Sequence, residues 1–260
     1  MLRKVTLDGS GFIVSLSESF QFYSGYMLSD KLTVFEQGQV LLFNKPLYWT
    51  SFDLVNKVRN IIRSTLGIKK LKVGHAGTLD PLASGLMIIC TGRETKNIDK
   101  FRDLDKEYVA TIHLGATTPS FDLETETDNV YPTDQITEAL TRKALNDFLG
   151  EQMQVPPIFS AKLIAGKRAY EFARKGIDKT LEAVTIYFRE IELLSFNLPE
   201  IRIRLVCSKG TYIRSFARDI GIALGSGGYL SALERTAIGT FHVSKAYEIE
   251  NFQEFVVQMK

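Results

Sequence analysis

Residues 184–210 read VTIYFREIELLSFNLPEIRIRLVCSKG, and this stretch decides the fold class that the sequence predicts. Residues 184–196 and 200–210 are both rich in the β-branched, aromatic and aliphatic residues that favour strands. They follow one another directly, with no helix between them. Strands joined by a short connection pair antiparallel, because a parallel pair needs a long crossover. The stretch therefore predicts adjacent antiparallel strands.

The rest of the chain extends this pattern. Further strands are predicted over 39–44, 86–92, 106–115 and 233–243, and helices over 51–67, 93–103, 133–150, 211–225 and 248–260. The helix signals are Ser51 as N-cap, a stripe of Phe52, Val55, Val58 and Ile62, Gly67 as the stop, and Thr133 and Gly150 at the ends of a later helix. Because strands often run consecutively, the sequence predicts an α+β fold with a mainly antiparallel mixed sheet flanked by helices and loops.

The composition is that of an ordinary globular protein, with 45% hydrophobic and 24% charged residues in a chain of 260. No apolar run approaches the roughly 18 residues that span a bilayer, and the N-terminus lacks the apolar core of a signal peptide. We therefore expect no membrane contact. Separately from these features, we expect a monomer in the cytoplasm.

The cysteines and histidines exclude several kinds of site. Cys90 and Cys207 lie in apolar runs, so we expect buried, reduced thiols. The chain has only three histidines, and they are far apart in the sequence, which argues against a zinc site.

The net charge of +2 hides an uneven distribution. Residues 107–141 contain no Lys or Arg but several carboxylates. Basic residues gather elsewhere, in the clusters Lys69, Lys70 and Lys72; Lys162, Lys167 and Arg168; Arg174, Lys175 and Lys179; and Lys209, Arg214 and Arg218. Such clusters bind a polyanion if they converge in space, but each by itself is more typical of a solvated face.

Residues 74–86 read GHAGTLDPLASGL and surround a single acid, Asp80. Gly74, Gly77 and Gly85 permit conformations and close approaches that other residues do not. The stretch is neither a phosphate-binding P-loop nor a dinucleotide-binding motif, because it lacks their spacings. By itself, an Asp before a Pro is most simply a turn residue.

The longer segment GHAGTLDPLASGLMIICTGRETK resembles the catalytic segment of the TruB family of pseudouridine synthases. Other segments resemble the same family in the same order: NKPLYWTSFDLVNKVR, DKEYVATIHLGATTPSFD, VPPIFSAKLIAGKRAYEFARKG and CSKGTYIRSFARDIGIALG. The resemblance covers roughly residues 39–250 and implies the pseudouridine synthase fold. One departure is Tyr48, which stands where the family usually has glycine.

The resemblance implies a role for each matching residue. Asp80 is the nucleophile, and Arg214 in KGTYIR is the arginine that pairs with it. Tyr108 in KEYVA stacks against the target uracil and is a candidate for proton transfer. Tyr212 and Leu233 line the base pocket; without the resemblance, both would be interpreted as core residues.

The family acts on uridine 55 in the T-loop of tRNA, which must be flipped out of its loop to react. The resemblance implies that His75 helps to hold the RNA loop open. The reaction is an isomerisation that needs no metal and no cofactor. A mobile RNA-gripping insertion is expected over about 151–180, with four candidate backbone contacts: Lys162, Lys167, Arg168 and Arg174.

The expected domain organisation is simple. Residues 1–38 form an N-terminal extension, either disordered or lying before a true start at Met27, and residues 39–260 form the catalytic domain. The C-terminal PUA domain of many family members is expected to be absent.

Two alternatives to a tRNA pseudouridine-55 synthase stay open at this point. One is a catalytically silent RNA-binding chaperone that folds tRNA, against which the presence of Asp80, Tyr108 and Arg214 argues. The other is a synthase that acts on another, guide-selected RNA. The sequence also leaves three roles for Asp80: attack on C1′, attack on C6, or abstraction of a ribose proton.

Overall fold

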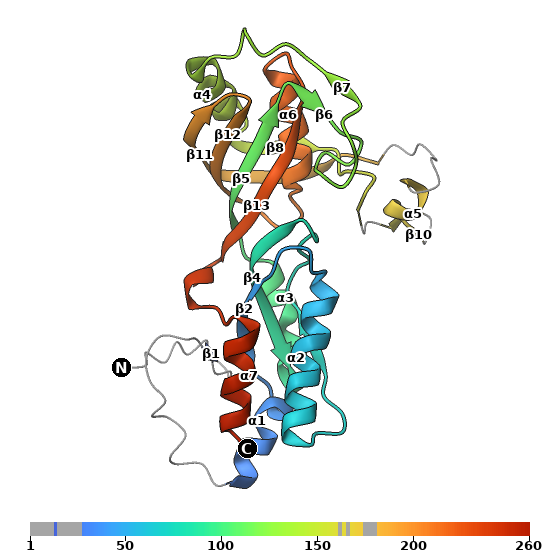
Figure 1. Cartoon of the computed structure of the whole chain (residues 1–260), viewed down its shortest axis with the longest axis vertical. Helices are drawn as coiled ribbons and strands as arrows, with labels where there is room; N and C mark the ends of the chain where they lie inside the picture. Colours follow the sequence, from blue (N-terminus) through green and yellow to red (C-terminus); the bar gives the residue numbers. More distant parts are fainter. Residues whose placement is uncertain (1–12, 15–27, 161–162, 165–166, 174–180) are drawn as a thin grey trace. The chain divides into compact units, whose positions relative to one another are not determined.

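The structure is a computed structural model that describes residues 13–14, 28–160, 163–164, 167–173 and 181–260. The described chain divides into two compact units. Unit 1 comprises the residues up to Leu104 together with Glu234–Lys260, and unit 2 comprises Asp105–Leu233. Figure 1 labels their elements. No helix in these described ranges is long and apolar enough to cross a membrane.

Unit 1 is built on a sheet with the strand order β1–β2–β4–β13. Its members are β1 (Ile13–Val14), β2 (Val40–Lys45), β4 (Ala83–Thr91) and the end of β13 (Gly228–Ile238), with β3 (Val73–His75) on β4 and β14 (Phe241–His242) on β13. Strands β2 and β4 are antiparallel, with Lys45 opposite Gly85. This register sets the end of β2 beside the start of β4, where the Asp80 segment enters the sheet.

The sheet of unit 1 is buried on both faces, which explains its continuous apolar strands. Alternate residues Val40 and Leu42 of β2 join a cluster with Phe101 and Phe241. On the other face of β2, Phe43 packs edge-on against Phe252 of helix α7 (Ile249–Gln258), at 4.9 Å between ring centroids.

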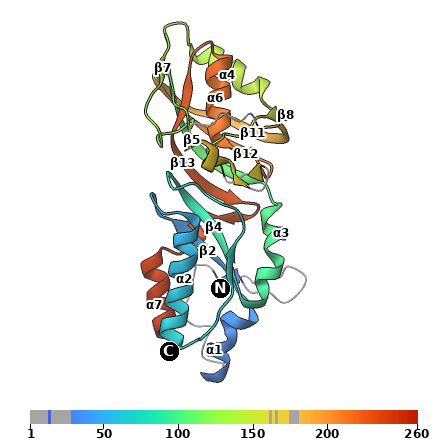
Figure 2. The ribbon, with the colours of Figure 1, turned by 90° about the vertical axis from the view of Figure 1, so that its right-hand side faces the viewer.

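The helices of unit 1 are α1 (Leu28–Gln37), α2 (Ser51–Leu66), η1 (Gly92–Asn97), α3 (Ile98–Arg102), η2 (Val243–Lys245) and α7 (Ile249–Gln258). Helices α2 and α7 lie side by side in both views (Figures 1 and 2). We expected regular structure to begin at residue 39, but helix α1 precedes that residue, and its Phe35 is buried. The helix predicted over 93–103 starts with 3₁₀ geometry and becomes α-helical at Ile98.

Two details of the α2 prediction are wrong. The N-cap is Thr50, whose side chain forms a capping box with Asp53, and Ser51 is instead the first helical residue. Phe52 is 66% exposed, because the buried face of the helix runs through Leu54, Val55 and Val58. Gly67 does end the helix in the left-handed conformation, as predicted.

Unit 2 contains the predicted antiparallel sheet, with strand order β13–β5–β12–β11–β8. Strands β11 (Val184–Asn197) and β12 (Glu200–Cys207) pair antiparallel, as do β12 with β5 (Lys106–Leu114) and β11 with β8 (Gly150–Gln154). The smaller elements are β6 (Ala116–Thr117), β7 (Asn129–Val130), β9 (Leu163–Ile164), β10 (Lys167–Arg168) and α5 (Ala169–Ala173). The predicted fold class, α+β with a mainly antiparallel sheet, is confirmed.

Two helices accompany the sheet of unit 2. Helix α6 (Ile213–Ala223) packs Phe216 against Phe188 of β11 and Phe148. Helix α4 (Glu138–Asp147) is shorter than predicted, because its N-cap is Thr137 and not Thr133. Gly150 lies beyond its end and opens β8.

Candidate active site

Asp80 lies in unit 1 on the loop that connects β3 to β4, here called the Asp80 loop and defined as residues 76–82. Backbone hydrogen bonds fix the residues on either side of Asp80. The Leu79 N–H donates to Ser51 Oγ at 2.8 Å, and Ser51 Oγ donates back to the Leu79 carbonyl at 2.9 Å. The Pro81 carbonyl accepts from the Tyr48 N–H at 2.7 Å. The start of α2 therefore holds the backbone that carries the carboxylate.

Tyr48 adopts a left-handed conformation, with a φ of 67°. This conformation explains why the family that the sequence resembles usually has glycine there, since a side chain costs about 1–2 kcal/mol in that region. The Tyr48 ring is 74% exposed and the bond to Pro81 is made by the backbone, so the local turn tolerates tyrosine.

Two cations of unit 1 surround the Asp80 loop. Lys45, at the end of β2, is fully buried and donates from Nζ to the carbonyls of Pro46 and Trp49. Burial lowers the pKa of Lys45 to about 8, although the charge of Asp80 acts to raise it. Arg235 of β13 is also buried and lies close enough to depress that pKa further.

His75 ends β3 immediately before the Asp80 loop. It is half-buried, and burial is the largest cause of a lowered pKa, which favours the neutral imidazole. A neutral ring next to the loop suits stacking against a base better than it suits phosphate binding.

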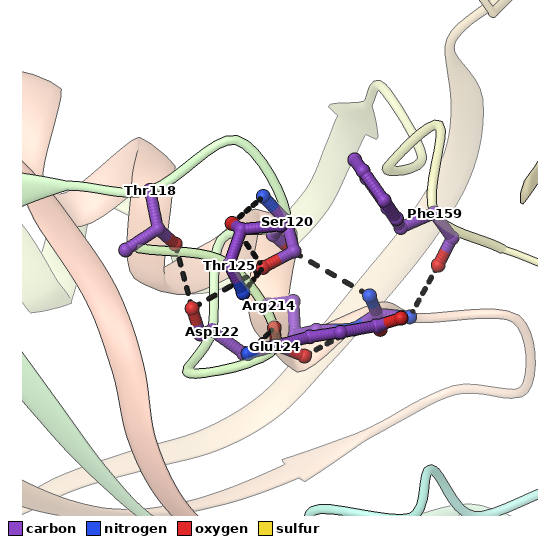
Figure 3. Close-up of polar contacts among 7 residues, drawn as sticks. All are labelled: Thr118, Ser120, Asp122, Glu124, Thr125, Phe159 and Arg214. Carbon is purple, nitrogen blue, oxygen red and sulfur yellow. Dashed lines mark hydrogen bonds and ion pairs between the residues drawn. The ribbon is translucent and has the colours of Figure 1, made fainter. Parts of the chain in front are cut away.

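Arg214 lies in unit 2, on the first turn of α6, and is 4% exposed (Figure 3). Its Nη2 donates to the Phe159 carbonyl at 2.8 Å and its Nη1 to the Ser120 carbonyl at 3.5 Å. Its Nε lies 3.6 Å from Oδ2 of the buried Asp122. These groups fix the guanidinium and give it one buried counter-charge within its own unit.

Asp122 is a residue that the sequence reasoning missed, because it is one of several carboxylates in residues 107–141, to none of which we assigned a role. Thr118 Oγ1 and Ser120 Oγ both donate to its carbonyl, at 2.7 and 3.2 Å, and the Glu124 N–H donates to its carboxylate at 2.9 Å (Figure 3). The available signal was its place at the end of the family segment GATTPSFD.

The remaining predicted substrate-binding residues of unit 2 lie on its sheet and at the start of α6. Tyr108 is buried on β5, and Leu233 is half-buried on β13. Tyr212 is the N-cap of α6, and Gln154 fixes its backbone by accepting from its N–H at 2.8 Å and donating to its carbonyl at 3.1 Å.

The predicted RNA-backbone contacts are only partly described. Lys162 and Arg174 lie outside the described residues. Lys167 and Arg168 form β10, which pairs antiparallel with β9. Their placement on RNA stays a prediction.

The two cysteines are buried and unpaired with each other, as predicted. Burial raises the pKa of both Cys90 and Cys207 to about 12, so both thiols stay protonated and unreactive. Within the described ranges, no three His, Cys, Asp or Glu side chains gather into a set that could ligate a metal.

Comparison with known proteins decides the family. The model of the TruB family pseudouridylate synthase N-terminal domain matches residues 63–213. A protein named tRNA pseudouridine synthase B from Phocaeicola vulgatus is 58% identical over 226 residues, which cover 87% of this chain and 96% of that protein. The protein of the same name from Parabacteroides distasonis is 57% identical over 224 residues, covering 86% and 95%. The chain belongs to the TruB family of pseudouridylate synthases. The predictions of family and of an enzyme are thereby confirmed.

Similar solved structures confirm the predicted pseudouridine synthase fold. The archaeal box H/ACA sRNP Nop10–Cbf5 complex contains a chain with a TM-score of 0.61 and 25% identity, matched over 85% of this chain. A Cbf5–Nop10–Gar1 complex gives 0.65 and 26% over 88% of this chain. This chain spans 54% and 56% of those two chains, about half of their length.

Proposed function

We propose that this TruB-family enzyme isomerises a uridine of tRNA to pseudouridine, and that the uridine is position 55 in the T-loop. The observation that carries the proposal is the 58% identity with a tRNA pseudouridine synthase B across 96% of that protein's length. The position of the target uridine follows from the resemblance of the catalytic segment.

Asp80 is the proposed nucleophile. Each of the three roles open to it requires an ionised carboxylate held in a fixed place. The hydrogen bonds of Leu79 and Pro81 supply the fixed place, and the charge of Lys45 supplies an electrostatic partner within unit 1. The resemblance assigns Arg214 as the cation that pairs with the nucleophile, and that pairing is part of the proposal.

In the proposed reaction the glycosidic bond between C1′ and N1 breaks and the uracil turns within the site. A bond then forms between C5 and C1′, the C5 proton leaves, and N1 takes up a proton, so atoms and electrons balance without a co-reactant. Tyr108 stacks against the uracil and is the candidate for the proton transfer, while Tyr212 and Leu233 line the pocket. His75 packs beside the flipped base in the opened RNA loop.

The proposal is tested by tritium release from tRNA transcripts labelled at C5 of uridine. The wild type is compared with Asp80→Asn, which keeps the shape and removes the charge, and with Asp99→Asn, a change at an exposed carboxylate of α3. We expect release by the wild type and Asp99→Asn, none by Asp80→Asn, and tRNA binding by all three. Replacing uridine 55 by cytidine in the transcript should abolish release.

Other results would select another function. If all three proteins bind tRNA and none releases tritium, the chain is an RNA-folding chaperone on a synthase fold. If Asp80→Asn keeps full activity, the nucleophile has been misassigned. Release from the cytidine-55 transcript would move the target to another uridine.

The predicted monomer, cytoplasmic location and independence from metals and cofactors complete the proposal. Gel filtration and assays with EDTA test the first and the last of these.

A further inference from the structure

Arg235 is the largest of the fully buried side chains in the described structure, at 1% exposure. It lies on β13 in unit 1, two residues after the proposed base-pocket residue Leu233. A buried guanidinium is costly unless its N–H groups are satisfied. The identity of its acceptors therefore shows what the residue does.

The acceptors of Arg235 are three backbone carbonyls, two before Asp80 in the chain and one after it. Its Nε donates to Leu86 at 2.7 Å, its Nη1 to Thr78 at 3.4 Å and its Nη2 to Gly77 at 3.3 Å. Gly77 and Thr78 lie on the arm that leads to Asp80, and Leu86 lies on β4, into which the chain runs after Asp80. Residues 77–78 before Asp80 and Leu86 after it are here called the two arms of the Asp80 loop, and one guanidinium bridges them.

The backbone of Arg235 is itself held in place. Strands β4 and β13 approach so closely that a Cβ added to Gly85 would collide with the backbone of Arg235. Gly85 also has a φ of 109°, which favours glycine. The close contact between β4 and β13 fixes the backbone from which the Arg235 side chain extends. The planar guanidinium fixes the directions of its N–H donors.

We propose that Arg235 is a positioning residue that holds the two arms of the Asp80 loop together and thereby places the Asp80 carboxylate for reaction. This inference rests on the proposed function, in which Asp80 acts on the substrate. Lysine could not replace arginine, because a single ammonium on a flexible stem lacks the fork that reaches both arms.

The charge of Arg235 supports the same role. Although burial is the main reason for the lowered pKa values of Lys45 and His75, the positive charge of Arg235 lowers both further. Arg235 therefore adds positive potential at the loop, in addition to its hydrogen bonds.

The test compares Arg235→Lys with the wild type and with Arg63→Lys as a matched control. Arg63 also donates to two loop carbonyls, those of Ile68 and Lys69, but on an exposed surface at the end of α2. Tritium release gives kcat and KM, filter binding gives tRNA affinity, and hydrogen exchange reports on the Asp80 loop. Arg235→Gln, which keeps an uncharged amide donor, is a second variant in case the lysine variant does not fold.

We expect Arg235→Lys to lower kcat by about 10²-fold, the scale of a 1 Å misplacement, with KM and tRNA affinity unchanged. Exchange should speed up in residues 76–86 and nowhere else in unit 1, and Arg63→Lys should behave like the wild type.

An unchanged kcat would overturn the proposal. Two other results would also overturn it: a loss of kcat together with faster exchange throughout unit 1, or unfolding of both Arg235 variants. In either case the role of Arg235 would be one of general stability. If the wild type itself releases no tritium, the proposed function fails, and exchange within residues 76–86 alone decides whether Arg235 holds the loop.

Discussion

Removing the Ser51 hydroxyl should both destabilise unit 1 and slow the reaction. Ser51 is 5% exposed, and its Oγ both accepts from the Leu79 N–H and donates to the Leu79 carbonyl. In Ser51→Ala, both backbone groups of the buried Leu79 lose this partner. Alanine cannot form either bond. The space left by the hydroxyl is too small to hold a water molecule that could replace it.

The magnitude follows from those two groups. A buried donor or acceptor left without a partner costs about 1–3 kcal/mol, so two cost about 2–6 kcal/mol. Alanine at the first position of α2 returns about 0.5 kcal/mol through its higher helix propensity. The expected loss in the free energy of unfolding is therefore about 1.5–5.5 kcal/mol. Because Leu79 precedes Asp80, we also expect kcat to fall by about tenfold or more.

Denaturant unfolding measures the stability, hydrogen exchange at Leu79 locates the change, and tritium release gives kcat. The matched control is Ser64→Ala, which removes a hydroxyl that donates to the Asn60 carbonyl on the exposed part of the same helix. That variant should change stability by no more than about 0.5 kcal/mol. A loss below about 1 kcal/mol in Ser51→Ala, or an equal loss in both variants, would refute the reasoning.

Three further predictions concern buried charges and close backbone contacts. Because burial lowers the pKa of Lys45 from 10.5 to about 8, the folded chain binds fewer protons than the unfolded chain between these values. Lys45 should therefore make the free energy of unfolding rise with pH between pH 8 and pH 10.5. In Lys45→Met this rise should be absent, which denaturant midpoints measured across that pH range would show. Asp122→Asn should cost about 1–3 kcal/mol in denaturant unfolding, because it removes a buried carboxylate charge 3.6 Å from Arg214 Nε; an unchanged midpoint would contradict this. Gly85→Ala should prevent stable folding of unit 1, since its Cβ would collide with the backbone of β13. Gly67→Ala, which has open space around it and bears only the strain of a positive φ, should cost about 1–2 kcal/mol, as thermal melting would show. Equal melting temperatures for the two alanine variants would be the contrary result.

The sequence determined by itself those features that depend on local pattern. Strand-favouring residue types predicted β11 and β12, and their direct succession predicted their antiparallel pairing, because both properties follow from neighbouring residues. The segment around Asp80 also indicated the family before any geometry was considered, because its motifs are contiguous in the chain. The prediction failed at helix ends, where Thr50 and Thr137 are the caps and not Ser51 and Thr133. Several polar residues near each end are competent caps, and the packing of the helix selects among them.

Only the tertiary structure decided which polar groups support the site. Asp122 beside Arg214, Ser51 beneath Leu79 and Arg235 across the arms of the Asp80 loop are separated from their partners by 92, 28 and up to 158 positions. No local pattern distinguishes these residues from surface charges or hydroxyls, because their roles depend on burial and on acceptors that the fold brings together. A carboxylate can be identified from its own neighbours in the sequence, whereas the groups that hold it in place are neighbours only in space.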